Sequence, residues 1–394
     1  MIIAESLFEI LLLGLAIPVL TFFCQIVFSL LPYKVKPEPI THDSSIAILI
    51  PAHNESSGLI PTLNSISQQD FINLQVLVVA DNCNDDTAEV ARAHGANVVE
   101  RFNDDLRGKG YALDFGIKYL AANTPPDIVI VLDADCLLHA GALPRLIADT
   151  LQYQRPIQAL YLMYNKPDAP LKSKIAEFAW AVKNWARPLG FYRLGLPCQL
   201  MGSGMAFPWS VISRVNLATG HIVEDMKLGA DLALLKLAPR FCPDALVTSF
   251  FPTNDSGIKS QRTRWEHGHI GMIVKESPVL LWNSLKHTNF PMMALALDMM
   301  VPPLALLLLI IIAISFLGML ACLFFQQWLP WGVPTLYLFT AGIAVMLAWL
   351  KYGRHILSLK DLMAAPFYII AKIPLYIKFF IKRQSEWVRS KRDS

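Results

Sequence analysis

The sequence predicts an α/β domain with a doubly wound, mostly parallel sheet, flanked by transmembrane helices on its N-terminal and C-terminal sides. Three observations support this prediction. Short, apolar, β-branched runs alternate with helical segments between residues 45 and 150. Polar residues follow several of these runs, and long uncharged stretches lie near both ends of the chain. Alternation of strands and helices is typical of a parallel sheet with helical crossovers.

The strands and helices of the middle region are predicted from their periodicity. Buried parallel strands are apolar without alternation, whereas helices repeat every three to four residues. The predicted strands are 45–50, 74–80, 97–100 and 128–132. The predicted helices are 59–68, 87–94 and 111–121, followed later by 226–237. A further amphipathic helix, 171–189, carries aromatic residues among lysines and is expected at the bilayer surface.

Composition places much of the chain in an apolar environment. Of its 394 residues, 54% are hydrophobic and 16% are charged, and the mean hydropathy is +0.42. Soluble domains carry about 25% charged residues. A net charge of +3 is too small to indicate nucleic acid as a partner. The six cysteines form no C-x-x-C pair, which predicts reduced, independently buried thiols rather than a disulfide framework or a zinc site.

Two stretches, Ile10–Tyr33 and Met299–Leu350, contain no charged residue, and they predict three apolar segments long enough to span a bilayer about 30 Å thick. They are Ile10–Tyr33, about Pro291–Phe325, and Gly332–Leu350. A signal peptide is the alternative for the first segment. However, Glu5 and Glu9 stand where a signal peptide has basic residues, and no small-residue cleavage site follows.

Basic residues after the spans predict that the region between them lies in the cytosol. These residues are Lys34 and Lys36 after the first span, and Lys351, Arg354 and Lys360 after the third. The segment Leu362–Ile381 contains two lysines and two prolines, which favours an interfacial helix over a fourth span. The predicted domains are an anchor at 1–33, a cytosolic domain at 34–285, two spans at 286–350, and an interfacial helix or fourth span with a basic tail at 351–394.

Polar residues follow the predicted strands. Pro51-Ala52-His53-Asn54-Glu55 follows the first strand, Asp81 the second, and Asp133-Ala134-Asp135 the fourth. Ligands of open α/β sheets bind outside the carboxyl ends of the strands, so these loops are expected to meet at one edge. Helix capping is the alternative for any single aspartate. Several such loops in one sheet favour a binding site.

Two carboxylates one residue apart, Asp133 and Asp135, suit Mg²⁺ or Mn²⁺ that also binds phosphate oxygens. The chain lacks both the G-x-x-x-x-G-K-[ST] loop and a G-x-G-x-x-G turn after a strand. A metal would therefore bind the phosphates here, as backbone amides do in the folds that have those loops. Lys109 would add a cation near the phosphates, or belong to a solvated turn.

Four further sequence features are candidates for a role in binding or catalysis. Glu224-Asp225 precedes a helix, where capping is the alternative. Gln261-Arg262-Thr263-Arg264-Trp265 suits diphosphate pairing and stacking on a sugar ring, with a basic face at the membrane as the alternative. Gly202 lies in a glycine-bearing loop that permits close approach to a sugar or packing against the membrane. Glu266-His267-Gly268-His269 lacks a suitably spaced third metal ligand.

In this order and spacing, these motifs resemble the inverting family-2 glycosyltransferases. The most similar branch is membrane-bound and includes cellulose, hyaluronan and poly-N-acetylglucosamine synthases and ceramide glucosyltransferase. The resemblance covers about residues 45–270. It implies a GT-A fold, a UDP-sugar donor, Mg²⁺ or Mn²⁺ as cofactor, and a place in a bacterial inner membrane.

The resemblance also implies a role for each motif residue. Glu55 and Asp81 would contact the uridine, Asp225 would be the general base, and Arg264 would neutralise the leaving diphosphate. The implied nucleotide-sugar-binding residues are Pro51, His53, Glu55, Asp81, Lys109, Asp133 and Arg264. The implied metal ligands are Asp133 and Asp135, and the implied acceptor-site residues are Gly202, Glu224, Gln261 and Trp265. A base on the acceptor and positive charge on the leaving group suit one direct, inverting displacement.

The acceptor stays open at this stage. Three or four membrane helices favour one sugar added to a lipid or lipid-linked saccharide, whereas Gln-x-x-Arg-Trp is associated with processive polysaccharide or oligosaccharide synthases. A nucleotide-sugar-binding subunit would be expected to lose Asp225, Asp133 or Asp135, and all three are present. A transporter would need ionisable residues within 299–350, which has none. The bilayer is an expected partner, as is a second copy or another protein of envelope synthesis.

Overall fold

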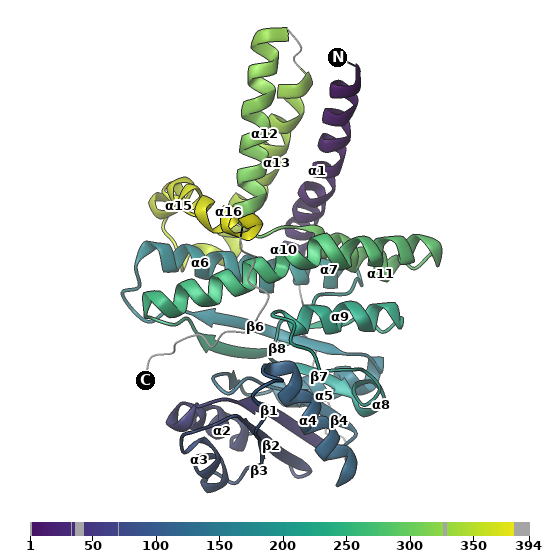
Figure 1. Ribbon diagram of the computed structural model, residues 1–394, viewed down its shortest axis with the longest axis vertical. Helices are drawn as coiled ribbons and strands as arrows, with labels where there is room; N and C mark the ends of the chain where they lie inside the picture. Colours follow the sequence, from purple (N-terminus) through teal and green to yellow (C-terminus); the bar gives the residue numbers. More distant parts are fainter. Residues whose placement is uncertain (1, 33, 36–42, 70, 326–328, 382–394) are drawn as a thin grey trace. The chain divides into compact units, whose positions relative to one another are not determined.

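The computed structural model describes residues 2–32, 34–35, 43–69, 71–325 and 329–381 (Figure 1). These residues form two compact units. The sheet unit comprises Tyr33–Lys166 and Pro197–Trp265, and the membrane unit comprises Met1–Pro32, Pro167–Leu196 and Glu266–Gln384, in each case within the described residues. Helix α10, Asp255–Lys286, begins in the first and ends in the second.

The sheet unit contains an eight-stranded mixed sheet in the order β3-β2-β1-β4-β7-β6-β8-β5. Its strands are β1 Ile46–Ala52, β2 Leu74–Asp81, β3 Asn97–Arg101, β4 Ile128–Val131, β5 Leu137–Leu138, β6 Ile157–Tyr164, β7 Met205–Pro208 and β8 Arg240–Phe250. Strand β1 is parallel to β2 and β4, with Ile46 opposite both Leu74 and Ile128. Strand β7 is antiparallel to β4 and β6. The predicted doubly wound, mostly parallel sheet is therefore confirmed, and the four predicted strands agree to within two residues at each end.

Helices of the sheet unit follow the strands much as predicted. They are α2 Ile60–Ser67, α3 Thr87–Ala93, α4 Lys109–Ala122, α5 Ala142–Tyr153, α8 Trp209–Ile212 and α9 Glu224–Leu234. Two of them begin two residues earlier than predicted, and both earlier starts matter. Gly108 caps α4 with φ +126°, so Lys109 is the first residue of a helix rather than part of a solvated turn. Glu224 and Asp225 likewise lie in the first turn of α9.

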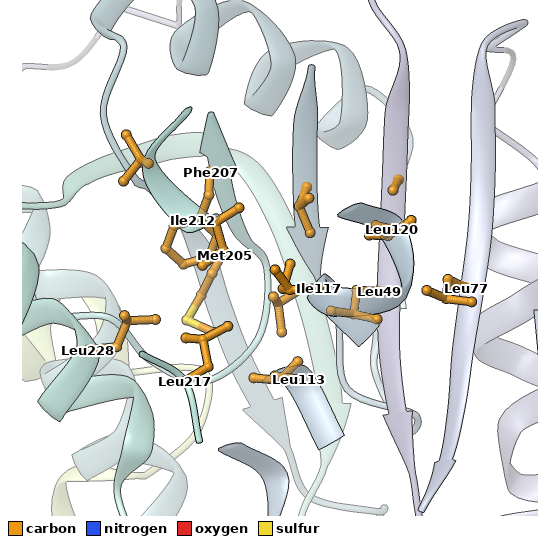
Figure 2. Close-up of a cluster of buried hydrophobic side chains, with 14 of the residues drawn as sticks. Leu49, Leu77, Leu113, Ile117, Leu120, Met205, Phe207, Ile212, Leu217 and Leu228 are labelled. Carbon is orange, nitrogen blue, oxygen red and sulfur yellow. The ribbon is translucent and has the colours of Figure 1, made fainter. Parts of the chain in front are cut away.

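One face of the sheet is covered by α4 and α9 through a single apolar cluster (Figure 2). Leu49 and Leu77 of the sheet belong to this cluster together with Leu113, Ile117 and Leu120 of α4, while Leu228 extends the cluster to α9. Gly116 lets α4 approach closely, because a Cβ there would lie 2.5 Å from the Leu49 side chain. This packing fixes the first turns of both helices near the carboxyl ends of β1 and β4.

Three helices of the membrane unit are long and apolar enough to cross a bilayer. The candidate spans are Phe8–Ser29 in α1, Leu304–Phe324 in α12 and Pro330–Gly353 in α13 and the π-helical turn after it. Their helices are α1 Ile2–Ser29, α12 Leu304–Phe325 and α13 Leu329–Ala348, which lie side by side (Figure 1). Gly318 allows α12 to touch α13, since a Cβ there would lie 1.9 Å from the Pro330 carbonyl oxygen. Small residues favour such close helix contacts in membranes.

The predicted second span, about Pro291–Phe325, is wrong in its first third. Helix α11, Phe290–Met300, ends before Pro302-Pro303, and α12 begins at Leu304. Two consecutive prolines remove two backbone donors and restrict the residues before them, which breaks the helix. The third span begins at Pro330 instead of Gly332, in the first turn of α13, where proline is well tolerated. The predicted turn residues Gln326 and Gln327 lie outside the described residues.

The remaining helices of the membrane unit are short. They are α6 Leu171–Ala181, α7 Arg187–Arg193, α14 Leu359–Met363, α15 Ala365–Ala371 and α16 Ile373–Ile381. A π-helical turn, Val182–Ala186, joins α6 to α7, in place of the single helix predicted at 171–189. The segment Leu362–Ile381 is interrupted at Ala364 and Lys372, and it is not among the three candidate spans.

A buried polar network joins three helices of the membrane unit. The Arg187 guanidinium donates to Asp298 Oδ1 at 2.7 Å and to Gln25 Oε1 at 2.8 Å. The Gln25 amide donates to the same Asp298 oxygen at 2.6 Å. All three side chains are buried. A buried ion pair needs such additional hydrogen bonds to offset the cost of desolvating its charges.

Candidate functional site

The polar loops that follow the strands line a cavity of about 550 Å³ in the sheet unit. Seven residues predicted to bind a nucleotide-sugar line it together: Pro51, His53, Glu55, Asp81, Lys109, Asp133 and Arg264. They come from the ends of β1, β2 and β4, from the start of α4, and from α10. Such a volume is within the range of small-ligand pockets in proteins. Parallel strands bring these loops to one edge because their carboxyl ends point the same way.

A buried ion pair fixes Asp81, the cavity-lining residue at the end of β2. Arg101 Nη1 lies 2.6 Å from Asp81 Oδ1, and each side chain is only 9% exposed. Burial raises the pKa of Asp81, while the Arg101 guanidinium opposes that rise. The His53 Nδ1–H donates to the Asp81 carbonyl oxygen at 2.7 Å, linking the β1 and β2 loops. Sequence reasoning missed Arg101, although a charged residue closing a buried strand was a usable signal.

A group of possible metal ligands follows β4. One ligand atom from each of Asp133, Asp135 and Cys136 lies within 4.8 Å of the others. Mg²⁺ and Mn²⁺ favour oxygen ligands, so the two carboxylates fit such an ion. Burial raises the pKa of the Cys136 thiol well above its ordinary value, and a protonated thiol is a poor ligand for a hard cation. The fitting donor set is therefore Asp133 and Asp135.

The Glu266-His267-Gly268-His269 segment makes structural contacts in the membrane unit. His267 Nε2 lies 3.2 Å from the Leu375 carbonyl oxygen, and His269 Nε2 lies 3.3 Å from that of Met299. Glu266 pairs with Lys372 on the segment between α15 and α16. Within the described residues, the group at Asp133 is the one that could hold a metal ion. The six cysteines are free thiols, but the predicted burial holds only for Cys136, Cys198 and Cys242.

Lys109 connects three segments of the site. Its ammonium lies 2.5 Å from Asp133 Oδ1 after β4 and 3.8 Å from Glu224 Oε1 at the start of α9. It also donates to the Gly202 carbonyl oxygen at 2.7 Å. Burial acts to lower the pKa of Lys109, but the carboxylates of Asp133 and Glu224 outweigh that effect and raise the pKa above its ordinary value. Lys109 is therefore a charged ammonium at every physiological pH.

The acidic pair at the start of α9 faces the glycine loop. Burial raises the pKa of Glu224, and the nearby Lys109 ammonium opposes that rise. Asp225 Oδ1 accepts a hydrogen bond from the Met226 amide at 2.8 Å. Gly202 has φ +93°, and a Cβ there would lie 3.3 Å from Asp225 Oδ2. Only glycine fits this conformation and this close approach without strain.

A second cavity, of about 260 Å³, lies against this acidic pair. Its lining includes Glu224, Asp225, Asn216, Thr219 and Leu217. Asp225 therefore lines a different cavity from Asp133, and Lys109 contacts residues of both. Gln261 and Trp265 lie on α10 beside Arg264 but are outside the lining of these two cavities. The structure thus gathers the donor-side residues and leaves the predicted acceptor-side residues dispersed.

The chain is similar to known proteins over most of its length. Residues 42–268 match the family described as glycosyltransferase like family 2. The 4,4'-diaponeurosporenoate glycosyltransferase of Staphylococcus haemolyticus is 29% identical over 294 residues, which cover 68% of this chain and 74% of that protein. The poly-beta-1,6-N-acetyl-D-glucosamine synthase of Staphylococcus epidermidis is 25% identical over 246 residues, 61% of this chain and 57% of that protein.

Solved structures are also similar. A mannosyltransferase, PcManGT from Pyrobaculum calidifontis in complex with GDP-Man and Mn²⁺, aligns over 87% of this chain and 99% of its own, with 18% identity and a TM-score of 0.49.

Proposed function

We propose a specific reaction for this chain, which belongs to the glycosyltransferase like family 2 and is a glycosyltransferase with a GT-A fold. In the proposed reaction, a sugar passes from a UDP-sugar, with Mg²⁺ or Mn²⁺, to a lipid or lipid-linked saccharide at the membrane. The observation that carries this proposal is the single cavity lined by the β1, β2 and β4 loops together with Lys109 and Arg264.

The donor side of the cavity suits a nucleoside diphosphate. Asp81, held by Arg101, and Glu55 would bind the uridine, while Arg264 would pair with the diphosphate. Asp133 and Asp135 would hold the divalent ion, which supplies positive charge to the leaving diphosphate when bound. Arg264 would add a second, fixed positive charge.

The acceptor side suits base catalysis by Asp225. Its carboxylate lies at the first turn of α9 and lines the smaller cavity, where an acceptor hydroxyl would reach it. Loss of a proton to Asp225 would make that hydroxyl oxygen a nucleophile for the anomeric carbon. A single displacement of this kind inverts the configuration at that carbon. An α-linked donor would then give a β-linked product.

Three candidate spans support an acceptor at the membrane. The basic residues Lys34, Lys351 and Arg354 beside the spans favour a cytosolic sheet unit, and the bacterial relatives favour a bacterial inner membrane. The short helices α15 and α16 favour the interfacial position of Leu362–Ile381 over a fourth span.

Processive synthesis of a polysaccharide or oligosaccharide is the second candidate. Gln261-x-x-Arg264-Trp265 and the similarity to a poly-beta-1,6-N-acetyl-D-glucosamine synthase favour it. Product length separates the two candidates. A single addition gives a product one sugar larger than the acceptor, whereas processive synthesis gives a ladder.

The test is nucleoside diphosphate release by the purified protein in detergent. A panel of UDP-sugars and GDP-mannose would be assayed with Mn²⁺, with Mg²⁺ or with EDTA, and with or without a bacterial lipid extract. We expect one UDP-sugar to support release that requires both the metal and the lipid. Release in EDTA would contradict the metal, and release from GDP-mannose alone would contradict the UDP-sugar. Nucleotide binding without turnover of any donor in the presence of the lipid would contradict the proposed reaction.

A further inference from the structure

Lys109 occupies the point where the two acidic parts of the site meet. Asp133 follows β4, and Glu224 begins α9, yet one ammonium contacts both carboxylates. The same ammonium donates to the carbonyl oxygen of Gly202, the residue packed against Asp225. Its side chain is only 17% exposed, so solvent screens these contacts weakly.

Several carboxylates act on this ammonium. Asp133, Glu224 and Asp225 each favour its charged form, and Asp135 acts in turn on Asp133. Removing the Lys109 ammonium would therefore strengthen the pull of these carboxylates on any added cation.

The ammonium and a divalent ion would share one carboxylate. Asp133 Oδ1 already lies 2.5 Å from Lys109 Nζ, and Asp133 belongs to the group that could hold the ion. Two cations on one carboxylate repel each other. A diphosphate bound in the same cavity would bring negative charge close to both the ammonium and the divalent ion, which would offset their repulsion. Lys109 therefore penalises a divalent ion that arrives alone more than one that arrives with the diphosphate.

We propose that Lys109 is a positioning residue that couples metal binding to donor binding, so that the divalent ion binds tightly only together with the nucleoside diphosphate. This inference rests on the proposed function. Coupling between two ligands is reciprocal: if UDP tightens the binding of Mn²⁺, then Mn²⁺ tightens the binding of UDP by the same factor. The tether from Lys109 to Glu224 would also hold the first turn of α9, and with it Asp225, in place for the acceptor.

The test measures free Mn²⁺ by electron paramagnetic resonance during titration of the full-length protein in detergent, with and without UDP. In the unchanged protein we expect UDP to lower the Kd for Mn²⁺ by more than about tenfold, as expected for one charge a few ångströms away. Lys109→Met should bind Mn²⁺ alone about tenfold more tightly than the unchanged protein, and UDP should then add much less.

Two further variants keep the test sharp. Glu224→Gln removes a competing carboxylate from Lys109, so the ammonium pairs more firmly with Asp133, and Mn²⁺ alone should bind more weakly. Lys118→Met, on the exposed face of the same helix, removes the same charge and should leave Mn²⁺ binding unchanged. Opposite shifts in the Lys109 and Glu224 variants would be difficult to obtain from partial unfolding.

The outcomes separate this inference from the proposed function. One outcome is that every variant binds Mn²⁺ tightly with UDP, and that all of them bind Mn²⁺ without UDP as the unchanged protein does. This outcome would overturn the coupling while leaving the metal-dependent reaction intact. Weaker binding of Mn²⁺ alone to Lys109→Met would also overturn it. Absence of Mn²⁺ binding in the unchanged protein, with and without UDP, would overturn both.

Discussion

Two cations of the membrane unit are paired one to one with carboxylates, whereas in the sheet unit's site several carboxylates gather around one ammonium. Arg187 is paired with Asp298, and Lys372 with Glu266. In the site, Lys109 contacts both Asp133 and Glu224, and Asp225 also acts on it. Paired charges hold helices together, whereas clustered carboxylates repel one another and attract a cation. The comparison indicates that the first set serves structure and the second set serves a reaction at the expense of stability.

The largest expected effect separates activity from stability at the site. Asp225→Asn should lower turnover by roughly 10²–10⁴-fold, the usual contribution of a general base. It should not lower the melting temperature, because it removes one of several mutually repelling carboxylates. Product formation and thermal unfolding followed by tryptophan fluorescence measure the two effects. Full turnover would remove Asp225 from the base role, and a lower melting temperature would contradict mutual repulsion among the clustered carboxylates.

The membrane unit should respond in the opposite sense. Arg187→Met leaves Asp298 buried without its cation and should cost about 3–5 kcal/mol of unfolding free energy. The matched control is Arg92→Met, whose ion pair with Glu100 is on the surface, with side chains 48% and 39% exposed. That pair should contribute about 0–1 kcal/mol. Denaturant unfolding in one detergent compares the two variants, and equal losses would refute the structural role of the buried pair.

Much of the sheet was predictable because each strand is marked by a short run of neighbouring apolar residues. The runs at 46–52 and 76–80 are uniformly apolar, which is the pattern expected of a strand buried on both faces. The polar residues that follow them meet at one edge because parallel strands share a direction. This reasoning brought together Pro51, His53, Glu55, Asp81 and Asp133, which line one cavity. The family resemblance, not strand direction, added Lys109 and Arg264 to the same site.

The connections within the site were not predictable from spacing. Lys109 meets Gly202 across 93 residues, and Arg101 meets Asp81 across 20, so only the fold brings each pair together. The break at Pro302-Pro303 is a different case. Its signal was present in the sequence, but the uncharged run around it favoured one long span.

Loss of a metal ligand should have a smaller effect than loss of the base. Asp135→Ala should weaken Mn²⁺-dependent UDP binding by about tenfold or more, because even residues that only support a metal ligand contribute that much. The control is Asp114→Ala, which removes a carboxylate paired with Lys118 on α4. In EDTA, the Asp135 variant and the unchanged protein should bind UDP equally. Calorimetric titration with UDP measures these affinities, and equal affinity in Mn²⁺ would sink the metal assignment.

The smallest predicted effect is on the pH dependence of stability. It concerns His269, a buried, neutral histidine of the membrane unit. Burial, together with Lys183 and Arg187 nearby, lowers the pKa of His269 well below its ordinary value. The folded state therefore keeps His269 neutral at a pH where the unfolded chain, with a pKa of about 6.5, takes up a proton. Since the unfolded state then binds more protons, stability falls as the pH falls below about 6.5, by up to about 1.4 kcal/mol per pH unit.

His269→Gln should remove this pH dependence. A glutamine amide can still donate to the Met299 carbonyl oxygen that His269 Nε2 contacts, but it does not titrate. Melting temperatures between about pH 7.5 and about pH 5.5 should fall less steeply in this variant than in the unchanged protein. The exposed His287→Gln serves as the control and should keep the original slope. An unchanged slope in His269→Gln would mean that protonation of His269 is tolerated in the fold, contrary to the effect expected of burial beside Lys183 and Arg187.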